Sequence, residues 1–403
     1  MKPRNIVIIN DFAHINGGAA KVALSSAVEL AKNYNVYLLT AVKPISEIVQ
    51  NSSIRLICLD QKDILKDKNR IRAIAQGLWN VRAYRALKKL LTDLSPKDTI
   101  IHYHGWTKAL SPSILSVTSK VPHKVVFTLH DYFLCCPNGG MFNYKKQEIC
   151  DITAGSIRCF VCNCDVRNYP QKIYRFIRHL IQRYYLNRHR HYSIIYISDL
   201  NKTVSKKYFK IDKTSWFYLK NPVDFTSNSY SNISDNQVYL FMGRLSAEKG
   251  VYLFCEAMRN LKLKGRILGD GYLMDSLKNK YPEIDFCGWK SGKEKDEILL
   301  QTKALVFPSL WYEGAPLTIY EMQALGIPCI VPNRCAAAEA VIDNITGFVF
   351  NTGSLPSLED AIIRCENANL TDIQQNISAS FNASDYSIST HTKHLIDIYN
   401  NIL

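Results

Sequence analysis

Short apolar runs alternate with polar or amphipathic stretches along the first half of the chain. Runs typical of buried parallel strands lie at residues 4–11, 36–40, 54–59, 99–104, 124–130 and 193–198. Segments with helical spacing separate several of them, at 19–33 and most clearly at 71–94. This alternation predicts a mostly parallel sheet with helices on both faces.

The same alternation starts again after a polar stretch without periodicity. Further strands are predicted at 238–242, 266–268, 284–287, 304–307, 328–331 and 347–350. We therefore expect an N-terminal domain at 1–220, a hinge at 221–236 and a second domain at 237–384. Residues 385–403 are predicted to form a C-terminal helix that packs back on the first domain.

Composition fits a globular protein that is long enough for two domains. The 403 residues are 47% hydrophobic and 21% charged, which excludes a disordered chain. A formal net charge of +15 indicates an anionic partner, whether nucleotide phosphates, a nucleic acid or a membrane surface. No apolar run approaches the roughly 18–20 residues that span a bilayer, and the chain opens with a strand, so we expect a cytoplasmic protein.

Two predicted helices are strongly basic. The segment 173–190 carries an apolar stripe, whereas cations occupy the rest of its surface. The stripe consists of Ile173, Phe176, Ile177, Leu180, Ile181 and Tyr184, and the cations are Lys172, Arg175, Arg178, Arg183, Arg188 and Arg190. Helix 71–94 adds Arg72, Arg82, Arg85, Lys88 and Lys89. These faces favour peripheral association with the anionic inner face of the cell membrane; the alternative is a solvated face whose stripe packs into the domain.

Residues 132–169 interrupt the alternation with a cysteine-rich insertion. Six of the twelve cysteines lie between 135 and 164. The spacing Cys159-x2-Cys162-x-Cys164 suits a tetrahedral structural zinc site. The candidate ligands are Cys136, Cys150, Cys159, Cys162 and Cys164. A disulfide and free buried thiols remain alternatives. Free thiols would fit a cytoplasmic protein, in which cysteines are usually reduced.

The stretch 304–328 carries the clearest chemistry. It predicts a buried strand, a turn and a short helix that begins at Pro316 and ends at Gly326. Glu313 lies in the turn and Glu321 in the helix, and free N–H groups around 315–318 make an anion site. Two carboxylates around an anion site can hold a nucleotide-linked sugar. The alternative is that both are ordinary surface glutamates.

Other strand ends add candidate site residues. Arg244 and Lys249 follow one strand together, so both cations can approach a diphosphate. Gly17 and Gly18 allow close approach of a phosphate or sugar, although their turn lacks the dinucleotide spacing. His130 ends an apolar strand and precedes Asp131, which favours a role in the site. We expect His104, at the end of another strand, to be structural.

Taken in order, these motifs resemble the retaining glycosyltransferases of the GT-B fold, family 4. The resemblance spans nearly the whole chain. It rests on Gly17-Gly18-Ala19, His130-Asp131-Tyr132, Asn221-Pro222-Val223-Asp224, Gly243-Arg244-Leu245, Glu248-Lys249-Gly250, Gly269-Asp270-Gly271, Pro308-Ser309, Glu313-x7-Glu321, Gly326-Ile327-Pro328 and Thr346-Gly347. The cysteine-rich insertion resembles a segment of those members that build bacterial surface polysaccharides.

The resemblance implies an α/β protein in which two Rossmann-like, doubly wound domains face each other across a cleft. It implies a retaining hexosyltransferase of class EC 2.4 in polysaccharide biosynthesis. The second domain would hold a nucleotide-sugar donor, and the first a growing glycan or lipid-linked acceptor. No Asp-x-Asp motif occurs, so we expect catalysis without a metal cofactor, with Arg244 and Lys249 in its place.

The resemblance also implies roles for individual residues. Glu313, His130, Lys249 and Arg244 would be catalytic. The donor would contact Gly17, Gly18, Arg244, Lys249, Gly269, Gly271, Gly288, Glu313, Gly314, Leu317, Thr318 and Glu321. By this analogy Glu313 contacts the sugar and Glu321 the ribose. Ala20 replaces a Glu common in the family, and Ala315-Pro316 replaces Phe-Gly, which puts the identity of the donor in doubt.

Three other functions compete with this one. A nucleotide-sugar 2-epimerase of GT-B fold would lack the Glu313, Arg244 and Lys249 combination. A basic nucleic-acid-binding protein would explain the net charge, but the basic residues do not form a recognisable binding module. A catalytically silent glycan-binding relative would not need these three side chains.

Overall fold

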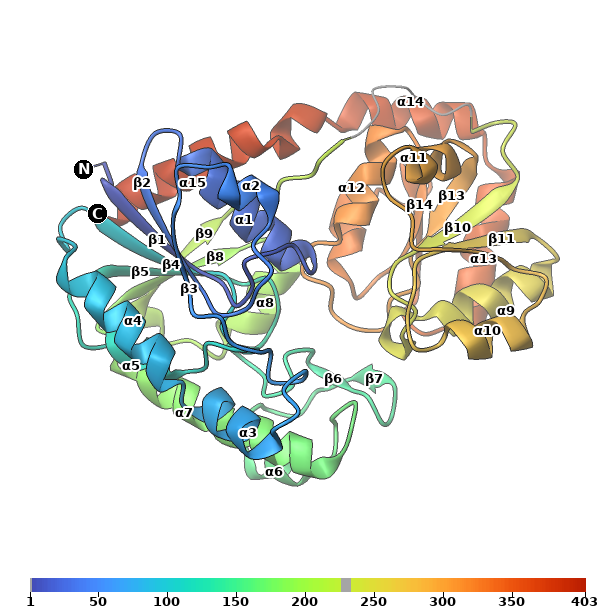
Figure 1. Ribbon diagram of the computed structural model, residues 1–403. Helices are drawn as coiled ribbons and strands as arrows, with labels where there is room; N and C mark the ends of the chain where they lie inside the picture. The colour runs from blue at the N-terminus through green and yellow to red at the C-terminus, as the bar shows by residue number, and fades with distance from the viewer. Residues whose placement is uncertain (1, 226–232) are drawn as a thin grey trace. The chain divides into compact units, whose positions relative to one another are not determined.

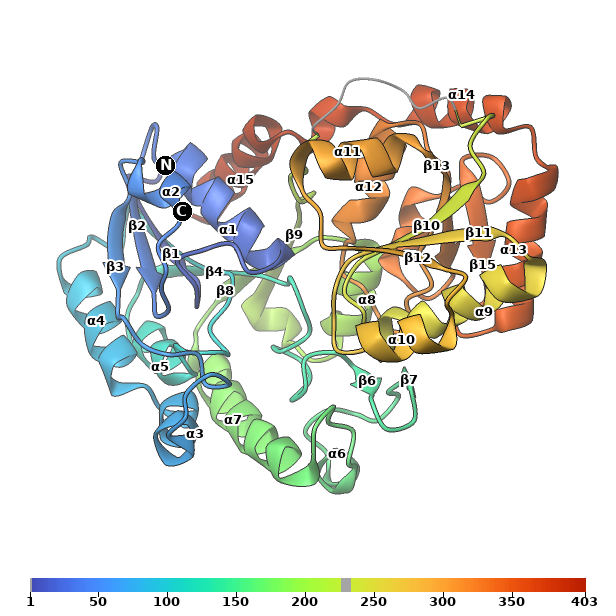
Figure 2. The same cartoon turned by 45° about the vertical axis from the view of Figure 1, so that its right-hand side comes forward.

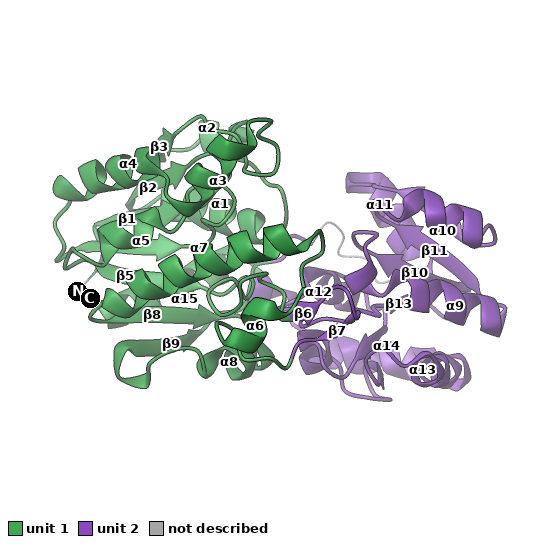
Figure 3. Cartoon of the chain, turned by 90° about the horizontal axis from the view of Figure 1, so that it is seen from below, with its two compact units in different colours: residues 1–141, 151–222, 387–403 green, residues 142–150, 223–386 purple. Residues whose placement is uncertain are grey.

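The computed structural model describes residues 2–225 and 233–403, so part of the predicted hinge, 226–232, lies outside the described residues. The chain divides into two compact units (Figure 3). The first comprises residues 1–141, 151–222 and 387–403, and the second comprises 142–150 and 223–386. Each unit is built around its own parallel sheet.

The sheet of the first unit has seven parallel strands in the order β3-β2-β1-β4-β5-β8-β9. Every residue of β1 and β4 is buried, as expected for central strands of a sheet covered on both faces. The strands are β1 Asn5–Ile9, β2 Asn35–Thr40, β3 Arg55–Cys58, β4 Thr99–Tyr103, β5 Lys124–Thr128, β8 Tyr192–Tyr196 and β9 Thr214–Tyr218.

Helices cover both faces of this sheet (Figures 1 and 2). One face is covered by α1 Gly18–Leu30, α2 Glu47–Gln50 and α15 Ile388–Ile402, and the other by α4 Val81–Thr92, α5 Ser113–Thr118 and α7 Tyr169–Arg188. The remaining helices are α3 Arg70–Leu78, α6 Ile157–Val161, α8 Asp199–Lys206 and the 3₁₀ turn η1 Ile211–Lys213. Both α3 and α6 pack against α7.

The C-terminal helix α15 is part of the first unit and packs on α1. Leu395 and Tyr399 are fully buried against the core that contains β1. The Tyr399 hydroxyl lies 2.7 Å from His102 Nδ1, and His391 Nε2 lies 3.0 Å from Ser26 Oγ. Apolar burial and these buried polar contacts together fix the end of the chain to the first sheet.

The sheet of the second unit has six parallel strands in the order β12-β11-β10-β13-β14-β15. The strands are β10 Val238–Met242, β11 Lys264–Leu268, β12 Asp285–Gly288, β13 Thr302–Val306, β14 Cys329–Pro332 and β15 Gly347–Phe350. The predicted strands of the second half therefore form one sheet. All five residues of its central strand β13 are buried.

Helices also enclose the second sheet (Figure 2). One face carries α9 Val251–Leu261, α10 Met274–Lys280 and α13 Leu355–Asn367, and the other α11 Gly292–Leu300, α12 Leu317–Ala324 and α14 Leu370–Ser380. Short elements complete the unit: η2 Ala247–Lys249, η3 Ala336–Ala340, η4 Ala383–Tyr386 and the hairpin β6 Phe142–Asn143 with β7 Glu148–Ile149. The hairpin groups with the second unit, whereas the sequence assigns the whole insertion to the first domain.

The predicted helix 71–94 is wrong in one respect, because the structure has two helices there. The chain leaves helical geometry at Trp79 and Asn80, and the Asn80 side chain accepts a hydrogen bond from Ala83 N at the start of α4. Asparagine is a preferred N-cap, so it starts a new helix rather than continuing the old one. Strand β9 was not predicted at all.

For α7, the alternative in which the apolar stripe packs into the domain is wrong. Lys172, Arg178 and Gln182 are buried, whereas Leu180 and Tyr184 of the apolar stripe are exposed. The buried polar side chains have specific partners: Arg178 donates to Thr107 O at 2.7 Å, and Gln182 to Phe133 O at 2.8 Å. These bonds offset the desolvation of the polar groups, so helical periodicity alone does not predict which face is buried.

Among the described residues, no helix is both long and apolar enough to cross a bilayer.

Protonation of His391 should destabilise the first unit in acid. His391 Nδ1 donates to Lys220 O at 2.7 Å, and burial lowers its pKa to about 4. The unfolded chain binds this proton below about pH 6.5, so stability is complete above that pH and is lost as pH falls towards 4. Between about pH 7 and 4, the unfolding free energy should fall by up to about 3 kcal/mol more in the wild type than in His391→Gln. Equal pH slopes in denaturant titrations would contradict this assignment.

Candidate active site

The loops that follow β10, β11 and β12 are joined by backbone hydrogen bonds at the carboxyl edge of the second sheet. Gly243 N donates to Leu268 O at 3.0 Å, and Gly269 N donates to Gly288 O at 2.9 Å. A Cβ atom on Gly269 would lie 1.9 Å from Gly243 O, so only glycine permits this approach. Ligands of parallel sheets bind beyond this edge, which makes the three loops the natural floor of a site.

Gly250 brings Lys249 against the loop that follows β13. Its φ of +70° is in the left-handed region, and a Cβ atom there would lie 1.9 Å from Pro308 O. Leu310 N also donates to Glu248 O at 2.9 Å. The loops 243–250 and 308–316 are thereby held together, although they come from different strands.

Lys249 and Glu313 form a largely buried ion pair between these loops. Lys249 Nζ lies 2.5 Å from Glu313 Oε1, and the two side chains are 20% and 13% exposed. The same oxygen accepts hydrogen bonds from Trp311 Nε1 at 2.6 Å and Ser309 Oγ at 2.9 Å. Three donors converge on Oε1, and no described protein group donates to Oε2, which leaves that oxygen for a ligand hydroxyl.

The environment of Glu313 keeps its carboxylate ionised. Burial by itself raises the pKa of a carboxyl, but the charge and hydrogen bond of Lys249, with the donors Trp311 and Ser309, outweigh it. The pKa of Glu313 is therefore lower than its ordinary value. At neutral pH the side chain is an acceptor for hydroxyl groups, not an acid.

The N-terminus of α12 faces the same turn. Pro316 is the N-cap residue, not the first helical residue as predicted, and the N–H groups of Leu317 and Thr318 donate to no acceptor in the described chain. The Thr318 hydroxyl is also buried without a partner. These groups form a surface that can bind an anion.

Glu321 lies further along α12 and pairs with Lys295 of α11. Lys295 Nζ is 2.7 Å from Glu321 Oε2. The pair lines a small pocket together with Asp224 and Phe225. Lys295 could not be assigned from the sequence, because it lies 26 positions before Glu321 and no motif links the two.

Arg244 is placed differently from Lys249. Its side chain is 62% exposed, and Nη2 lies 3.1 Å from Glu248 Oε1, which also accepts from Ser246 Oγ at 2.8 Å. The two predicted cations are thus paired with different carboxylates. Because Arg244 is exposed, it can rotate towards a ligand at little cost.

In the first unit, His104 and His130 meet at the ends of β4 and β5. His104 Nδ1 lies 2.8 Å from His130 Nε2. Burial lowers the pKa of His130 to about 3 and that of His104 well below its ordinary value, so both rings are neutral at pH 7. His104, predicted to be structural, is therefore the hydrogen-bond partner of the predicted site residue. His104 Nε2 is buried without a partner.

The loop after β4 is fixed by Asp11 at the end of β1. Its carboxylate accepts three backbone hydrogen bonds of 2.8 Å, from Lys108, Ala109 and Leu110. Three adjacent strand ends, those of β1, β4 and β5, thus contribute to one surface of the first unit.

The predicted site residues fall into two groups. Gly17, Gly18 and His130 belong to the first unit, where Gly17 precedes α1. The second unit contains Arg244, Lys249, Gly269, Gly271, Gly288, Glu313, Gly314, Leu317, Thr318 and Glu321. Within it the structure brings Lys249 to Glu313, and it adds Ser309, Trp311 and Lys295.

Comparison with known proteins finds a family match in the second unit. Residues 224–379 match the family described as glycosyl transferases group 1. The UDP-Gal:alpha-D-GlcNAc-diphosphoundecaprenol alpha-1,3-galactosyltransferase of Escherichia coli is 23% identical, covering 93% of this chain and 97% of its own length.

Residues 224–379 are thus similar to the group 1 glycosyltransferases.

Solved structures share the fold of this chain. Anabaena Alr3699/HepE in complex with UDP superimposes with a TM-score of 0.65 at 15% identity, covering 98% of this chain and 100% of that chain. WaaG, a glycosyltransferase of lipopolysaccharide biosynthesis, gives a TM-score of 0.63 at 14% identity, with 98% and 99% covered. The predicted GT-B class with two Rossmann-like parallel sheets is confirmed.

Lys172 of α7 places its amine among sulfur atoms of the cysteine-rich insertion. Lys172 Nζ lies 3.3 Å from Cys164 Sγ and 3.4 Å from Cys159 Sγ. All twelve cysteines are free thiols, and the described residues contain no group of three or more His, Cys, Asp or Glu side chains arranged to hold a metal ion. The zinc site stays a prediction, which elemental analysis of freshly purified protein can check.

Replacement of Gly250 should disrupt the site. In Gly250→Ala the new methyl group collides with Pro308 O, so the loop 308–313 must move away from Lys249. We expect nucleotide affinity, measured by calorimetry with a nucleoside-diphosphate panel, to fall at least about tenfold, which is roughly 1.4 kcal/mol.

Gly292→Ala is the matched control for this variant. Gly292 has a φ of +56° but no atom within 4 Å of a Cβ position, so alanine there introduces only backbone strain, roughly 1–2 kcal/mol. Equal nucleotide affinity in the two variants would show that the contact with Pro308 does not organise the site.

Proposed function

We propose that this enzyme transfers a sugar from a nucleotide-diphosphate donor to a lipid-linked or growing glycan acceptor, with retention at the anomeric carbon. The observation that carries the proposal is the Lys249–Glu313 pair next to the unpartnered N-terminus of α12. The relative from Escherichia coli is named for a UDP-sugar donor and a diphosphoundecaprenol-linked acceptor, and that of Anabaena was crystallised with UDP.

The second unit offers what departure of a nucleotide requires. Cleavage of the sugar–phosphate bond develops negative charge on the diphosphate. The N–H groups of Leu317 and Thr318, the Thr318 hydroxyl and the exposed guanidinium of Arg244 can stabilise that charge, with the helix dipole in the favourable direction. We expect them to do so without a metal cofactor.

Glu313 is proposed to hold the donor sugar. Its Oε1 is occupied by Lys249, Trp311 and Ser309, so Oε2 is the oxygen that would accept sugar hydroxyls. A carboxylate fixed by three donors does not need to reorganise during the reaction, and this lowers the barrier. Glu321, with Lys295, would hold the ribose by the same logic.

The first unit is proposed to provide the acceptor side. His130 is neutral at pH 7, so it would act as a hydrogen-bonding group near the reacting carbon rather than as an acid. Gly17 and Gly18, exposed at the start of α1, would approach the donor phosphate.

Substitution of Glu313 should abolish most transfer while the fold persists. The donor is first chosen as the nucleotide-sugar that raises the melting temperature most. With it, Glu313→Gln should transfer roughly 10²–10³-fold more slowly, the usual cost of one preorganised polar group. The product's anomeric configuration, read by NMR, should match that of the donor, and inversion would contradict retention.

Glu283→Gln is the control for this experiment. Glu283 pairs with Arg259 at 2.7 Å on the exposed surface of the same unit, so its loss should leave transfer unchanged. Near-normal transfer by Glu313→Gln would contradict the assigned role, whatever the donor.

We also propose that the first unit rests on an anionic membrane, where a lipid-linked acceptor would be found. The helices α3, α6 and α7 lie side by side (Figure 1), and all three expose large apolar residues. Ile71 is 83% exposed, Ile157 84% and Leu180 47%. Residues 68–92 contain seven cations and no acid, so the apolar surface is accompanied by positive charge.

Membrane binding should depend on these exposed isoleucines. Wild-type protein should co-sediment with phosphatidylglycerol vesicles, less with phosphatidylcholine vesicles and less at high salt. Ile71→Glu with Ile157→Glu should weaken binding at least about tenfold, because each charge opposes both burial and anionic lipid.

Ile211→Glu is the control, since Ile211 is 83% exposed but lies in η1, outside these helices. If the double variant and the control bind vesicles equally well, the proposed surface is wrong.

A further inference from the structure

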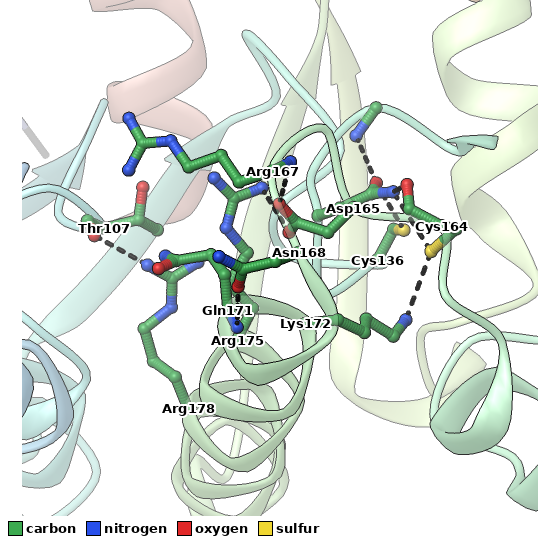
Figure 4. A network of polar contacts seen from close by, with 12 residues as sticks. Thr107, Cys136, Cys164, Asp165, Arg167, Asn168, Gln171, Lys172, Arg175 and Arg178 are labelled. Carbon is green, nitrogen blue, oxygen red and sulfur yellow. Dashed lines mark hydrogen bonds and ion pairs between the residues drawn. The ribbon is translucent and has the colours of Figure 1, made fainter. Parts of the chain in front are cut away.

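We propose that Lys172 and Cys164 form a reversible N–O–S crosslink, a covalent modification site in the first unit. Lys172 is 0% exposed, and its amine points from α7 to the sulfur of Cys164 (Figure 4). The distance from Lys172 Nζ to Cys164 Sγ is 3.3 Å, and the distance from the same nitrogen to Cys159 Sγ is 3.4 Å. An amine and two thiols are thus in van der Waals contact inside the protein.

The hydrogen bonds of the Lys172 amine go to sulfur atoms rather than to a carboxylate. A buried amine is usually paired with a carboxylate. The nearby carboxylate of Asp165 is already used: Arg175 Nη1 lies 3.2 Å from Oδ2, and Arg167 N donates to Oδ1 at 3.0 Å. Among the described residues, both hydrogen bonds of the Lys172 amine end on sulfur.

The sulfur of Cys164 is fixed from the other side. Asn138 Nδ2 donates to it at 3.4 Å, and Cys136 Sγ donates to Asn138 Oδ1 at 3.1 Å. Cys164 is 3% exposed, so large reagents are excluded, and the proposal requires an oxidant as small as dioxygen. The fixed geometry and the exclusion of bulk water favour reaction of the oxidised thiol with the amine beside it over its reaction with water.

The crosslink forms with dioxygen as the oxidant. The N–H bond of the amine and the S–H bond of the thiol break, and an N–O and an O–S bond form. One oxygen atom of dioxygen enters the bridge, and the other leaves as water with the two hydrogens. Nitrogen and sulfur lose four electrons together, and dioxygen gains four. Dithiols reverse the step, giving amine, thiol and water while two dithiols become disulfides.

The bridge would join the cysteine-rich loop to the helix that supports the acceptor-side loops. From α7, Arg178 donates to Thr107 O at 2.7 Å, and its guanidinium lies 5.2 Å from the ring centre of Phe133. Phe133 N in turn donates to Asp131 Oδ1 at 2.9 Å, next to His130. A crosslink at Lys172 therefore stiffens the helix that holds both loops. The crosslink itself does not depend on the proposed function.

Mass spectrometry of the full-length protein tests the proposal. After exposure to air, the linked peptides containing Cys164 and Lys172 should be heavier than their sum by one oxygen atom less two hydrogens. Dithiothreitol should abolish the difference. Lys172→Arg and Cys164→Ser should never show it, whereas Cys135→Ser, in a neighbouring buried cysteine, should retain it. Lys172→Met, checked by its melting temperature, replaces Lys172→Arg if arginine prevents folding.

Three results would overturn the proposal. Loss of two hydrogens with an unmodified Lys172 would show a Cys159–Cys164 disulfide. Stoichiometric zinc in protein that resists air oxidation would show that the thiols are metal ligands. An unchanged mass after prolonged exposure to air would show that the amine and thiol do not react.

Discussion

The candidate site depends on a carboxylate buried next to a lysine. Burial of Glu313 would be costly without a cation, and Lys249 supplies that cation from a different loop. The pair in turn requires a glycine after the lysine, since only Gly250 lets the two loops approach. One ion pair thus fixes the relative position of two strand ends. The turn that contains Glu313 leads directly into α12, so the pair also positions the start of that helix.

The first unit uses two neutral histidines and a carboxylate for a similar purpose. His104, His130 and Asp11 lie at adjacent strand ends, and their hydrogen bonds hold the loops beyond the sheet. Burial keeps both histidines neutral, so neither ring adds positive charge to this surface. The basic character of the chain lies elsewhere, partly on the helices with exposed isoleucines. Within the unit, the basic helices are therefore distinct from the strand ends that carry His104 and His130.

The fold was largely predictable because strand-helix alternation is a local signal. Each β-strand of the second sheet overlaps a run that the sequence predicts as a strand. Local spacing also placed Lys249, Glu313 and Thr318 near one edge. It could not pair Glu321 with Lys295, or turn α7 so that Arg178 is buried, because both depend on contacts between distant segments. The break at Asn80 was visible as an N-cap residue, yet helical periodicity outweighed it in the prediction.

A double-mutant cycle on transfer tests the central claim, that Lys249 and Glu313 act as a unit. The values of kcat/KM are measured for the wild type, Lys249→Met, Glu313→Gln and the double variant. If the pair is one unit, the double variant should lose no more than the worse single variant, since the second substitution removes an interaction already lost. Losses that multiply would show that the two side chains contribute independently, and would contradict the account.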